Sequence, residues 1–482
     1  MRDREASLHS LRGHAVPTWW TDAKLGIMVH WTPASVPAFA PTVAGIGELL
    51  ASGEPDALKD VPYSEWYENS LRFDDSQVSR HHRQHYGDRP YTEFALDFEA
   101  GAERWDPDAF ARAFADTGAG YVVFVAKHSD GYALWPTDAA HPFRSGWHSR
   151  RDLVGEMADA VRSVGLRFGL YYCGGFDWSF SDHRVGSMAD TLLAVPRGSY
   201  PAYAEAQVRE LIERYRPSVL WNDVAWPGDA RRLRRLMADY YRAVADGVLN
   251  DRWMPWRRLF DAARIPPVAK LVNWRAAKSA EETGGLVAPT PPHFDVRTPE
   301  YASPGDIATD PFELVRGMDR SFACNEHSAP QDFLGRGALL ETLIDVAAKG
   351  GNLLLNVGPR GVDASIPDAQ LTRLQWLGAF MGANRRALVG TRPWVVAGST
   401  TVEGAWLRYT TRGEDVFAFV DAAEDATTVT LDDVASSVTT TVESIDGTPL
   451  RWRDAPEGIS VELTPRSTPT VVVLGNVNAR TA

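Results

Sequence analysis

This sequence contains few cysteines and lacks the short motifs that mark the common nucleotide-binding and hydrolase sites. Its 482 residues include two cysteines, Cys173 and Cys324, in separate strand-like segments, so we expect no disulfide framework. No Gly-x-Gly-x-x-Gly follows the first strand-like run, and no Walker loop or Gly-x-Ser-x-Gly elbow occurs. These absences disfavour an open dinucleotide-binding sheet, a nucleotide phosphate site and an α/β-hydrolase triad.

Basic runs and long apolar runs are also missing. Lys and Arg number 50 against 63 Asp and Glu, a formal charge of -13, and the cluster Arg231–Arg235 is assigned to the solvated face of a helix. We therefore expect no nucleic-acid partner. No apolar stretch has membrane-spanning length, and the start Met1–Glu5 lacks the apolar core of a signal peptide. We expect no membrane partner and, by default, a cytoplasmic protein, although a trimmed secreted chain would look the same.

Metal-binding motifs are absent too. His81, His82 and His85 have helical spacing, but no His-Glu-x-x-His or paired-cysteine motif accompanies them. Such motifs are what typically identify a zinc site in a sequence. We interpret Ser79–His85 as a surface segment and predict neither a metal nor another cofactor.

What the sequence does contain is an alternation of short apolar runs and amphipathic segments before residue 390. The strand candidates are 24–30, 120–128, 167–172, 218–223, 247–251, 321–324 and 352–356. Nearly continuous apolar runs indicate strands buried on both faces, as in a parallel sheet covered by helices. One intervening helix begins at Asp106-Pro107, a capping residue followed by a first-turn proline. We predict an α/β fold with a (β/α)8-like barrel over residues 1–390 and a missed strand near Phe294–Glu300.

Beyond Gly390 the pattern changes to short alternating segments separated by turns. Examples are Val416–Val420, Thr427–Leu431 and Thr470–Leu474. Such segments are typical of antiparallel sheets. We predict a C-terminal antiparallel β-sandwich domain over residues 391–482 that packs on the barrel, with a separate carbohydrate-binding role as an alternative.

Polar and aromatic side chains gather at the ends of the predicted strands. These tips are His30-Trp31, Lys127-His128, Tyr171-Tyr172, Trp221-Asn222-Asp223 and Asn250-Asp251-Arg252-Trp253. The C-terminal strand ends are where a parallel barrel carries its chemistry, and polar groups beside flat rings suit a polyhydroxylated ligand. Asp223, flanked by Trp221 and Trp226, is the candidate catalytic carboxylate. Taken alone, it could equally cap the following turn.

Several longer segments carry a resemblance to a known family. They are Lys24–Trp31, Ser64–Tyr67, Lys127–Tyr132, Arg151–Glu156, Gly169–Tyr172, Leu220–Asp223, Leu249–Trp253 and Gly350–Pro359. In their order and spacing they resemble glycoside hydrolase family 29, the retaining α-L-fucosidases. Each segment alone is a weak signal, and their combination over almost the whole chain is a strong one.

The resemblance implies a barrel followed by a β-sandwich, and an exo-glycosidase that hydrolyses terminal α-L-fucosyl residues. It implies Asp223 as the nucleophile of a double displacement and Glu300 as the acid/base, with Glu281, Glu282 and Glu313 as open alternatives to Glu300. The fucose pocket that it implies is lined by His30, Tyr63, Glu65, Trp66, His128, Tyr171, Trp221, Arg252 and Phe322, with Met28 near the methyl group. The expected substrate is a fucosylated glycan or a small fucoside, and homo-oligomer formation stays open.

One position departs from the family pattern. Ser129 stands where the family usually has a second histidine. A serine hydroxyl is shorter than an imidazole, so one contact to a sugar hydroxyl would be lost or made through water. Two alternatives therefore stay open: a related glycosidase with an altered sugar preference, and a non-catalytic fucose-binding homologue.

Overall fold

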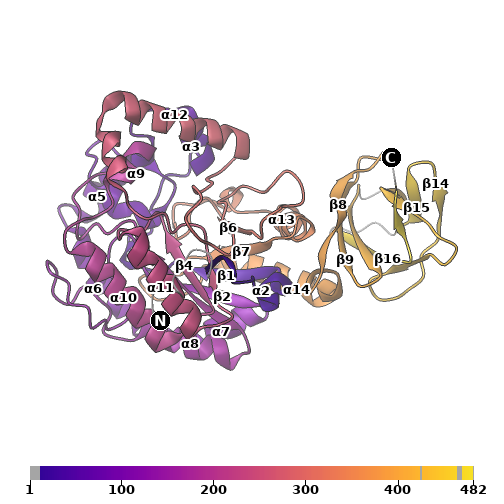
Figure 1. Cartoon of the computed structure of the whole chain (residues 1–482), viewed down its shortest axis with the longest axis horizontal. Coiled ribbons are helices and arrows are strands. Elements are labelled where there is room, and N and C mark those ends of the chain that lie inside the picture. Colours follow the sequence, from indigo (N-terminus) through magenta and orange to yellow (C-terminus); the bar gives the residue numbers. More distant parts are fainter. Residues whose placement is uncertain (1–10, 424–425, 464–468, 481–482) are drawn as a thin grey trace.

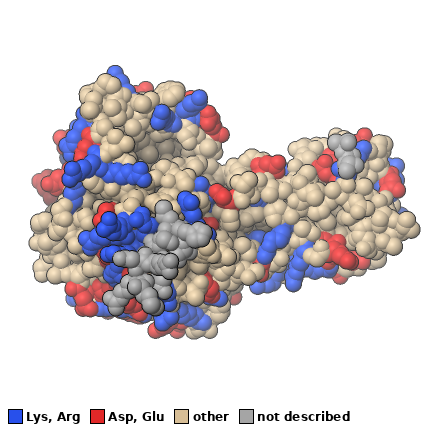
Figure 2. All heavy atoms as spheres, in the orientation of Figure 1, with Lys and Arg blue, Asp and Glu red and all other residues tan. Residues whose placement is uncertain are grey.

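The chain forms a curled parallel sheet surrounded by helices, followed by a smaller antiparallel domain (Figure 1). The computed structural model describes residues 11–423, 426–463 and 469–480, so the start Met1–Glu5 discussed above lies outside the described residues. Figure 2 shows both signs of charge interspersed over the two lobes of the molecule. Within the described ranges, no helix combines the length and apolarity that crossing a membrane requires.

Seven parallel strands form the sheet of the larger lobe. They are β1 (Leu25–Val29), β2 (Tyr121–Lys127), β3 (Arg167–Cys173), β4 (Val219–Asp223), β5 (Val248–Leu249), β6 (Glu313–Gly317) and β7 (Asn352–Val357). Their hydrogen-bonded order is β5-β4-β3-β2-β1-β7-β6. The predicted α/β fold class with a barrel-like parallel sheet is confirmed.

The segment before and including Glu300 occupies the place of the eighth strand, between β5 and β6. Val296 forms a parallel bridge with Asn250 after β5, and Glu300 forms one with Val315 of β6. The missed strand that we expected near Phe294–Glu300 is therefore present as isolated bridges instead of a continuous strand.

The strand predicted at 321–324 was wrong, because the strand of this region is β6, earlier in the chain. The apolar pair Phe322-Ala323 made the segment look like a buried strand. Its backbone is instead held by side chains, since Glu65 accepts a hydrogen bond from the Ala323 N–H at 3.0 Å and the Ser321 hydroxyl donates to the Ala323 carbonyl at 2.9 Å. These bonds take the place of a strand ladder.

Successive residues of each barrel strand face opposite sides of the sheet. Along β2, Val122 and Phe124 pack into the core between sheet and helices, whereas Val123 and Val125 pack inside the barrel. Every residue of β2 is buried, which explains its nearly continuous apolar run.

Helices cover the outside of this sheet. They are α6 (Phe94–Ala102), α7 (Pro107–Ala115), α8 (Leu153–Ser163), α10 (Tyr200–Tyr215), α11 (Ala230–Ala243), α13 (Arg336–Ala348) and α14 (Asp368–Leu388). Helix α2 (Thr18–Ala23) instead buries Trp20 and Ala23 in the cluster inside the barrel. Asp106 caps α7 as predicted, accepting a hydrogen bond from the Ala109 N–H at 3.0 Å.

Three further helices form a separate group in Figure 1, above the barrel in the view shown. They are α3 (Ile46–Ser52), α9 (Met188–Leu193) and α12 (Pro266–Thr283). All three contact one another or the short helix at Arg258–Arg264. They come from three distant parts of the sequence.

The smaller lobe contains antiparallel sheets. One has β8 (Arg392–Thr400), β9 (Trp406–Arg412), β10 (Asp415–Asp421), β13 (Thr441–Ser444) and β16 (Thr470–Gly475); another has β11 (Thr428–Asp432), β14 (Trp452–Ala455) and β15 (Gly458–Glu462). Leu407, Val429, Ile459 and Val472 share one apolar core between them. The predicted β-sandwich is confirmed, and β8 and β9 contact α13 of the larger lobe.

Candidate active site

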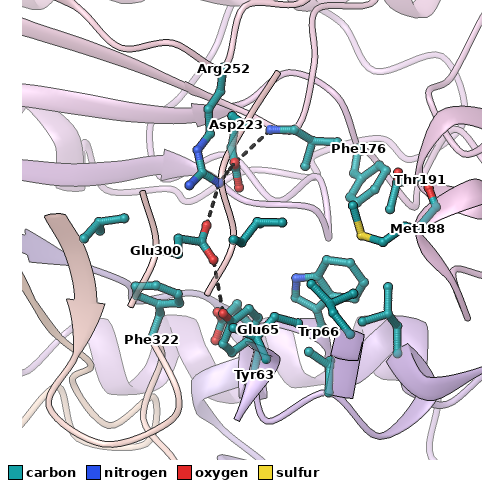
Figure 3. A pocket seen from close by; sticks show the side chains of 18 of the residues that line it. Tyr63, Glu65, Trp66, Phe176, Met188, Thr191, Asp223, Arg252, Glu300 and Phe322 are labelled. Atoms are coloured by element: carbon teal, nitrogen blue, oxygen red, sulfur yellow. Dashed lines mark hydrogen bonds and ion pairs between the residues drawn. The ribbon is translucent and has the colours of Figure 1, made fainter. Parts of the chain in front are cut away.

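A cavity of about 240 Å³ lies at the C-terminal ends of the barrel strands (Figure 3). The site residues that the family resemblance implies all contribute to its lining: Met28, His30, Tyr63, Glu65, Trp66, His128, Tyr171, Trp221, Asp223, Arg252, Glu300 and Phe322. These residues are up to 294 positions apart in the chain, from Met28 to Phe322. The fold therefore assembles the predicted set at one place.

Asp223, the last residue of β4, is held by three hydrogen bonds. Its Oδ1 accepts from Arg252 Nη1 at 3.0 Å and from the Val224 N–H at 2.8 Å, and its Oδ2 accepts from the Tyr171 hydroxyl at 2.6 Å. Val224 has a φ of 65°, an unfavourable conformation for a β-branched residue. This turn directs the Val224 N–H back to the carboxylate of Asp223, which precedes it. Backbone strain of this kind is typical of functional sites.

Arg252 connects Asp223 to Glu300. The same nitrogen, Nη1, donates to Asp223 Oδ1 at 3.0 Å and to Glu300 Oε1 at 2.5 Å. The other guanidinium nitrogens donate to the hydroxyl and carbonyl oxygens of Thr298 at 3.2 and 2.8 Å, and the guanidinium lies over the Trp221 ring at 4.8 Å. Because Arg252 is buried and each of its guanidinium nitrogens has a partner, its side chain is fixed in one orientation.

Glu300 is the carboxyl group that the cavity brings beside Asp223. Burial raises its pKa and the charge of Asp223 adds to that effect, whereas Arg252 and a hydrogen bond of 3.1 Å from the Tyr63 hydroxyl lower the pKa. A buried carboxyl group with a raised pKa is suited to donating a proton.

The three alternatives to Glu300 lie elsewhere. Glu281 and Glu282 are exposed near the end of α12. Glu313 is buried beneath the cavity, where it accepts hydrogen bonds from the Tyr121 hydroxyl and, at 3.1 Å, from the Trp221 ring nitrogen. None of these three carboxyl groups lines the cavity.

Two histidines form part of the cavity floor as neutral side chains. Burial lowers the pKa of His30 to about 4 and lowers that of His128 well below its ordinary value. The Nδ1 atom of His30 is 2.6 Å from the side-chain oxygen of Asn356, so Nδ1 carries the proton and Nε2 is free to accept one from a hydroxyl. The ring of His128 stacks on Tyr171 at 5.4 Å.

Glu65 and Phe322 lie at the same side of the cavity floor, where Glu65 is hydrogen-bonded to the residue after Phe322. Burial raises the pKa of Glu65 to about 8, against a bond from the Ala323 N–H that lowers it. Near neutral pH the carboxyl group is therefore mostly protonated and can donate to a hydroxyl. The ring of Phe322 contacts the rings of His30 and Tyr63, each at 5.2 Å, and offers an apolar surface.

Some residues that were grouped with the strand tips do not reach the cavity. Trp226 is buried against Trp253 at 5.4 Å, so its expected role as a flanking face for a sugar was wrong. Lys127 faces away from the cavity to a buried ion pair with Asp177 at 2.9 Å. Ser129 does not line the cavity either, and its hydroxyl lies 3.4 Å from the sulfur of Cys173.

The histidine segment forms helix α5 (Gln77–Tyr86). His81 and His85 stack on each other at 4.1 Å, but His82 is buried and lies 3.0 Å from the Tyr67 hydroxyl. The interpretation as a surface segment was therefore only half right, because the amphipathic helix turns His82 inward. Across the described residues, no group of three potential ligands is arranged to hold a metal ion.

Sequence reasoning missed two kinds of residue. Thr298 positions Arg252 and Asn356 positions His30; both lie in segments that the sequence singled out, Phe294–Glu300 and Gly350–Pro359, but neither was assigned a role. The outer wall of the cavity comes from α3, residues 58–61, α9, α12 and the segment after α12, and includes Leu50, Met188 and Val272. The long stretch 254–293 between Trp253 and Phe294 supplies α12 and the segment after it, but nothing in its sequence indicated a position over the barrel.

The comparisons with known proteins agree with this geometry. The sequence matches the family model described as alpha-L-fucosidase over residues 2–386. A putative alpha-L-fucosidase of Caenorhabditis elegans is 27% identical over 408 residues, which cover 82% of this chain and 71% of that protein. A solved alpha-L-fucosidase is 35% identical, with a TM-score of 0.83 over 98% of this chain and 99% of the other. The Thermotoga maritima alpha-fucosidase, crystallised with a mechanism-based inhibitor, is 34% identical, with a TM-score of 0.81 over the same shares.

Proposed function

This chain belongs to the α-L-fucosidase family of glycoside hydrolases, and we propose that it cleaves terminal α-L-fucosyl groups with retention, through a covalent intermediate on Asp223. The observation that carries the proposal is the arginine bridge between two carboxyl groups. Because one nitrogen of Arg252 bonds to both Asp223 and Glu300, the two bonded oxygens are separated by no more than the sum of 3.0 and 2.5 Å. Retaining glycosidases place their two carboxyl groups about 5 to 5.5 Å apart, and inverting ones place them further apart.

In the first step the Asp223 carboxylate attacks the anomeric carbon and forms an ester bond to it. The bond from that carbon to the glycosidic oxygen breaks, and its electron pair goes to the oxygen, which takes the proton of Glu300. In the second step Glu300, now ionised, takes a proton from water, whose oxygen attacks the same carbon. The ester bond breaks and returns the carboxylate of Asp223.

The electrostatics of the cavity support these roles. Arg252 and Tyr171 donate hydrogen bonds to Asp223, which hold its carboxylate in a fixed position for attack. When Asp223 becomes an ester it loses its negative charge, and one of the influences that raise the pKa of Glu300 disappears. Glu300, which has by then passed its proton to the leaving group, is more stable in its ionised form, as its role as the base of the second step requires.

The remaining lining suits a 6-deoxy sugar. His30, His128 and Glu65 offer one acceptor or donor each to ring hydroxyls, and Trp66 offers a flat ring. Phe322 and Met28 form an apolar surface that favours a methyl group over a hydroxymethyl group. The similar Thermotoga maritima enzyme has been crystallised with fucose, which supports assigning this floor to fucose.

Proton NMR of the reaction with an aryl α-L-fucoside tests the proposal. The first product to appear should be the α anomer of L-fucose, which then mutarotates to the equilibrium mixture. Initial appearance of the β anomer would refute the covalent role of Asp223. Absence of hydrolysis for every α-L-fucoside, with measurable L-fucose binding, would instead indicate a non-catalytic sugar-binding protein.

A further inference from the structure

The cavity has two chemically different parts. Its floor is rich in polar groups, as described above, whereas its outer wall is formed by aliphatic side chains. This outer wall is defined by Ile46, Leu50, Leu58, Val61, Met188, Thr191, Leu192, Val272, Ala276, Leu286, Val287, Ala288 and Pro289. Figure 3 shows Met188 and Thr191 on the far side of the cavity from Phe322.

The outer wall offers almost no hydrogen-bonding side chain. Thr191 is its single polar member, and its hydroxyl already donates to the Met188 carbonyl at 2.6 Å within α9. The backbone of Leu286 is also satisfied, because its N–H and carbonyl both pair with Glu300 at 3.1 and 2.9 Å. A second sugar placed here would bury hydroxyl groups without partners, which is unfavourable.

The position of Glu300 identifies this wall as the side of the leaving group. Under the proposed function, Glu300 gives its proton to the glycosidic oxygen, so the leaving group lies next to Glu300. The antiparallel bridge between Leu286 and Glu300 places the backbone of the outer wall next to that of Glu300, and both residues line the cavity. A leaving group that emerges from the floor therefore meets the aliphatic wall first.

Close packing maintains the shape of the wall. A β-carbon on Gly47 of α3 would lie 2.4 Å from the carbonyl oxygen of Gly284 at the end of α12, so the two backbones are in direct contact. The side-chain oxygen of Asn273 on α12 accepts from the Ala189 N–H of α9 at 2.8 Å. Several wall side chains, including Met188, Leu192 and Val272, are still partly exposed, which leaves apolar surface for a ligand to cover.

We propose that the preferred substrates are α-L-fucosides of a hydrophobic alcohol or phenol, whose apolar aglycone packs on this outer wall, and not fucosylated oligosaccharides. The proposal rests on the proposed function and specifies its substrate class. The products are L-fucose and the free apolar alcohol. Burial of the aglycone supplies the binding free energy that hydrogen bonds to a second sugar would otherwise supply.

The test compares kcat/KM for methyl, butyl, hexyl and octyl α-L-fucosides, whose leaving groups have nearly equal acidity, and for L-fucose α-linked to galactose. We expect kcat/KM to rise by about fourfold for each methylene group that the wall buries, and the octyl fucoside to exceed the disaccharide. Equal kcat/KM values for all the alkyl fucosides, or a higher kcat/KM for the disaccharide than for the octyl fucoside, would overturn the inference. Methyl fucoside contacts mainly the floor, so its hydrolysis alone reports on the proposed function.

Two matched variants connect the effect to the wall. Leu192→Asn places an amide of similar size in the wall, and we expect the ratio of octyl to methyl kcat/KM to fall by at least about tenfold. Leu259→Asn makes the same change at a leucine that lies outside the cavity and is 75% exposed. In this variant kcat/KM for the octyl and methyl fucosides should stay at the wild-type values. Equal ratios in Leu192→Asn and the wild type would refute the role of the wall.

Discussion

The Nη1 atom of Arg252 lies 2.5 Å from Glu300 Oε1, so the group proposed to donate a proton is hydrogen-bonded to a permanent cation. A cation lowers the pKa of a carboxyl group, whereas burial and a second carboxylate raise it. In this cavity the balance leaves the pKa of Glu300 raised. The arginine thus limits the pKa increase that burial alone would cause, so Glu300 can lose its proton in the first step and stay ionised until it takes one from water in the second.

Replacing Asp223 with glycine should remove the nucleophile while leaving space for a small anion. We expect kcat to fall by more than about a thousandfold. Azide should restore part of the activity and yield β-L-fucosyl azide, because it attacks from the face where the carboxylate stood. Steady-state kinetics with an aryl fucoside measure the fall in kcat and its partial recovery in azide, and NMR identifies the anomer of the fucosyl azide. Unchanged activity would exclude Asp223 as the nucleophile.

Replacing Glu300 with alanine should lower kcat/KM most for substrates whose leaving group must be protonated. For an alkyl fucoside, whose leaving group must be protonated, we expect kcat/KM to fall by about 10²- to 10⁴-fold. For a nitrophenyl fucoside the loss in kcat/KM should be far smaller. Glu313→Gln is the matched control, since this buried carboxyl group contacts Trp221 and not the cavity, and it should affect both substrates equally. Equal losses in Glu300→Ala would move the acid/base role to another residue.

Tyr63→Phe should shift the pH dependence of the reaction. The Tyr63 hydroxyl donates to Glu300 Oε2 at 3.1 Å and lowers the pKa of that carboxyl group. Without it the pKa rises, so protonated Glu300 persists to higher pH. The basic limb of the kcat/KM profile for an alkyl fucoside should move upward.

Tyr91→Phe serves as the control for Tyr63→Phe. Its hydroxyl donates to Asp130 at 2.8 Å, outside the cavity lining, and the basic limb should stay in place. A limb that moves downward in Tyr63→Phe, or moves equally in both variants, would contradict the assignment of that limb to Glu300.

The sequence was sufficient for the parts of the site that lie on strands. Asp223, His30 and Tyr171 could be placed because a parallel barrel brings its strand ends together. The error at Trp226 has a local cause, since β4 ends at Asp223 and the chain turns at Val224 in a left-handed conformation, so the direction of the Trp226 side chain does not follow from the strand. Patterns of hydrophobicity do not reveal such a turn in the absence of glycine.

The outer wall could not be predicted either, and the reason is a different one. It depends on contacts among α3, α9 and α12, and each of these helices is unremarkable in the sequence. In α12, Ala280 is the single buried residue, so the helix lacks the strong apolar stripe by which a core helix is identified. Gly47 permits the backbone of α3 to touch Gly284, a contact between positions 237 residues apart that no local pattern indicates.

Glu65→Gln should change stability in a manner that depends on pH. Burial raises the pKa of Glu65 in the folded protein to about 8, from 4.5 for an ordinary glutamate. The folded state therefore keeps this proton over a range in which the unfolded state loses it. The protonated carboxyl group contributes fully to stability below pH 4.5, and this contribution is lost as the pH rises towards 8.

Glutamine is neutral at every pH and can still accept the hydrogen bond from the Ala323 N–H. The unfolding free energy of Glu65→Gln relative to the wild type should therefore increase between pH 4.5 and 8, by at most about 1.4 kcal/mol per pH unit. Denaturant unfolding of both proteins at several pH values measures the difference. Glu281→Gln, at an exposed position on α12, should show a difference that is nearly independent of pH. A pH-independent difference for Glu65→Gln as well would mean that Glu65 is ionised in the folded protein, and its role as a hydrogen-bond donor to the sugar would then be wrong.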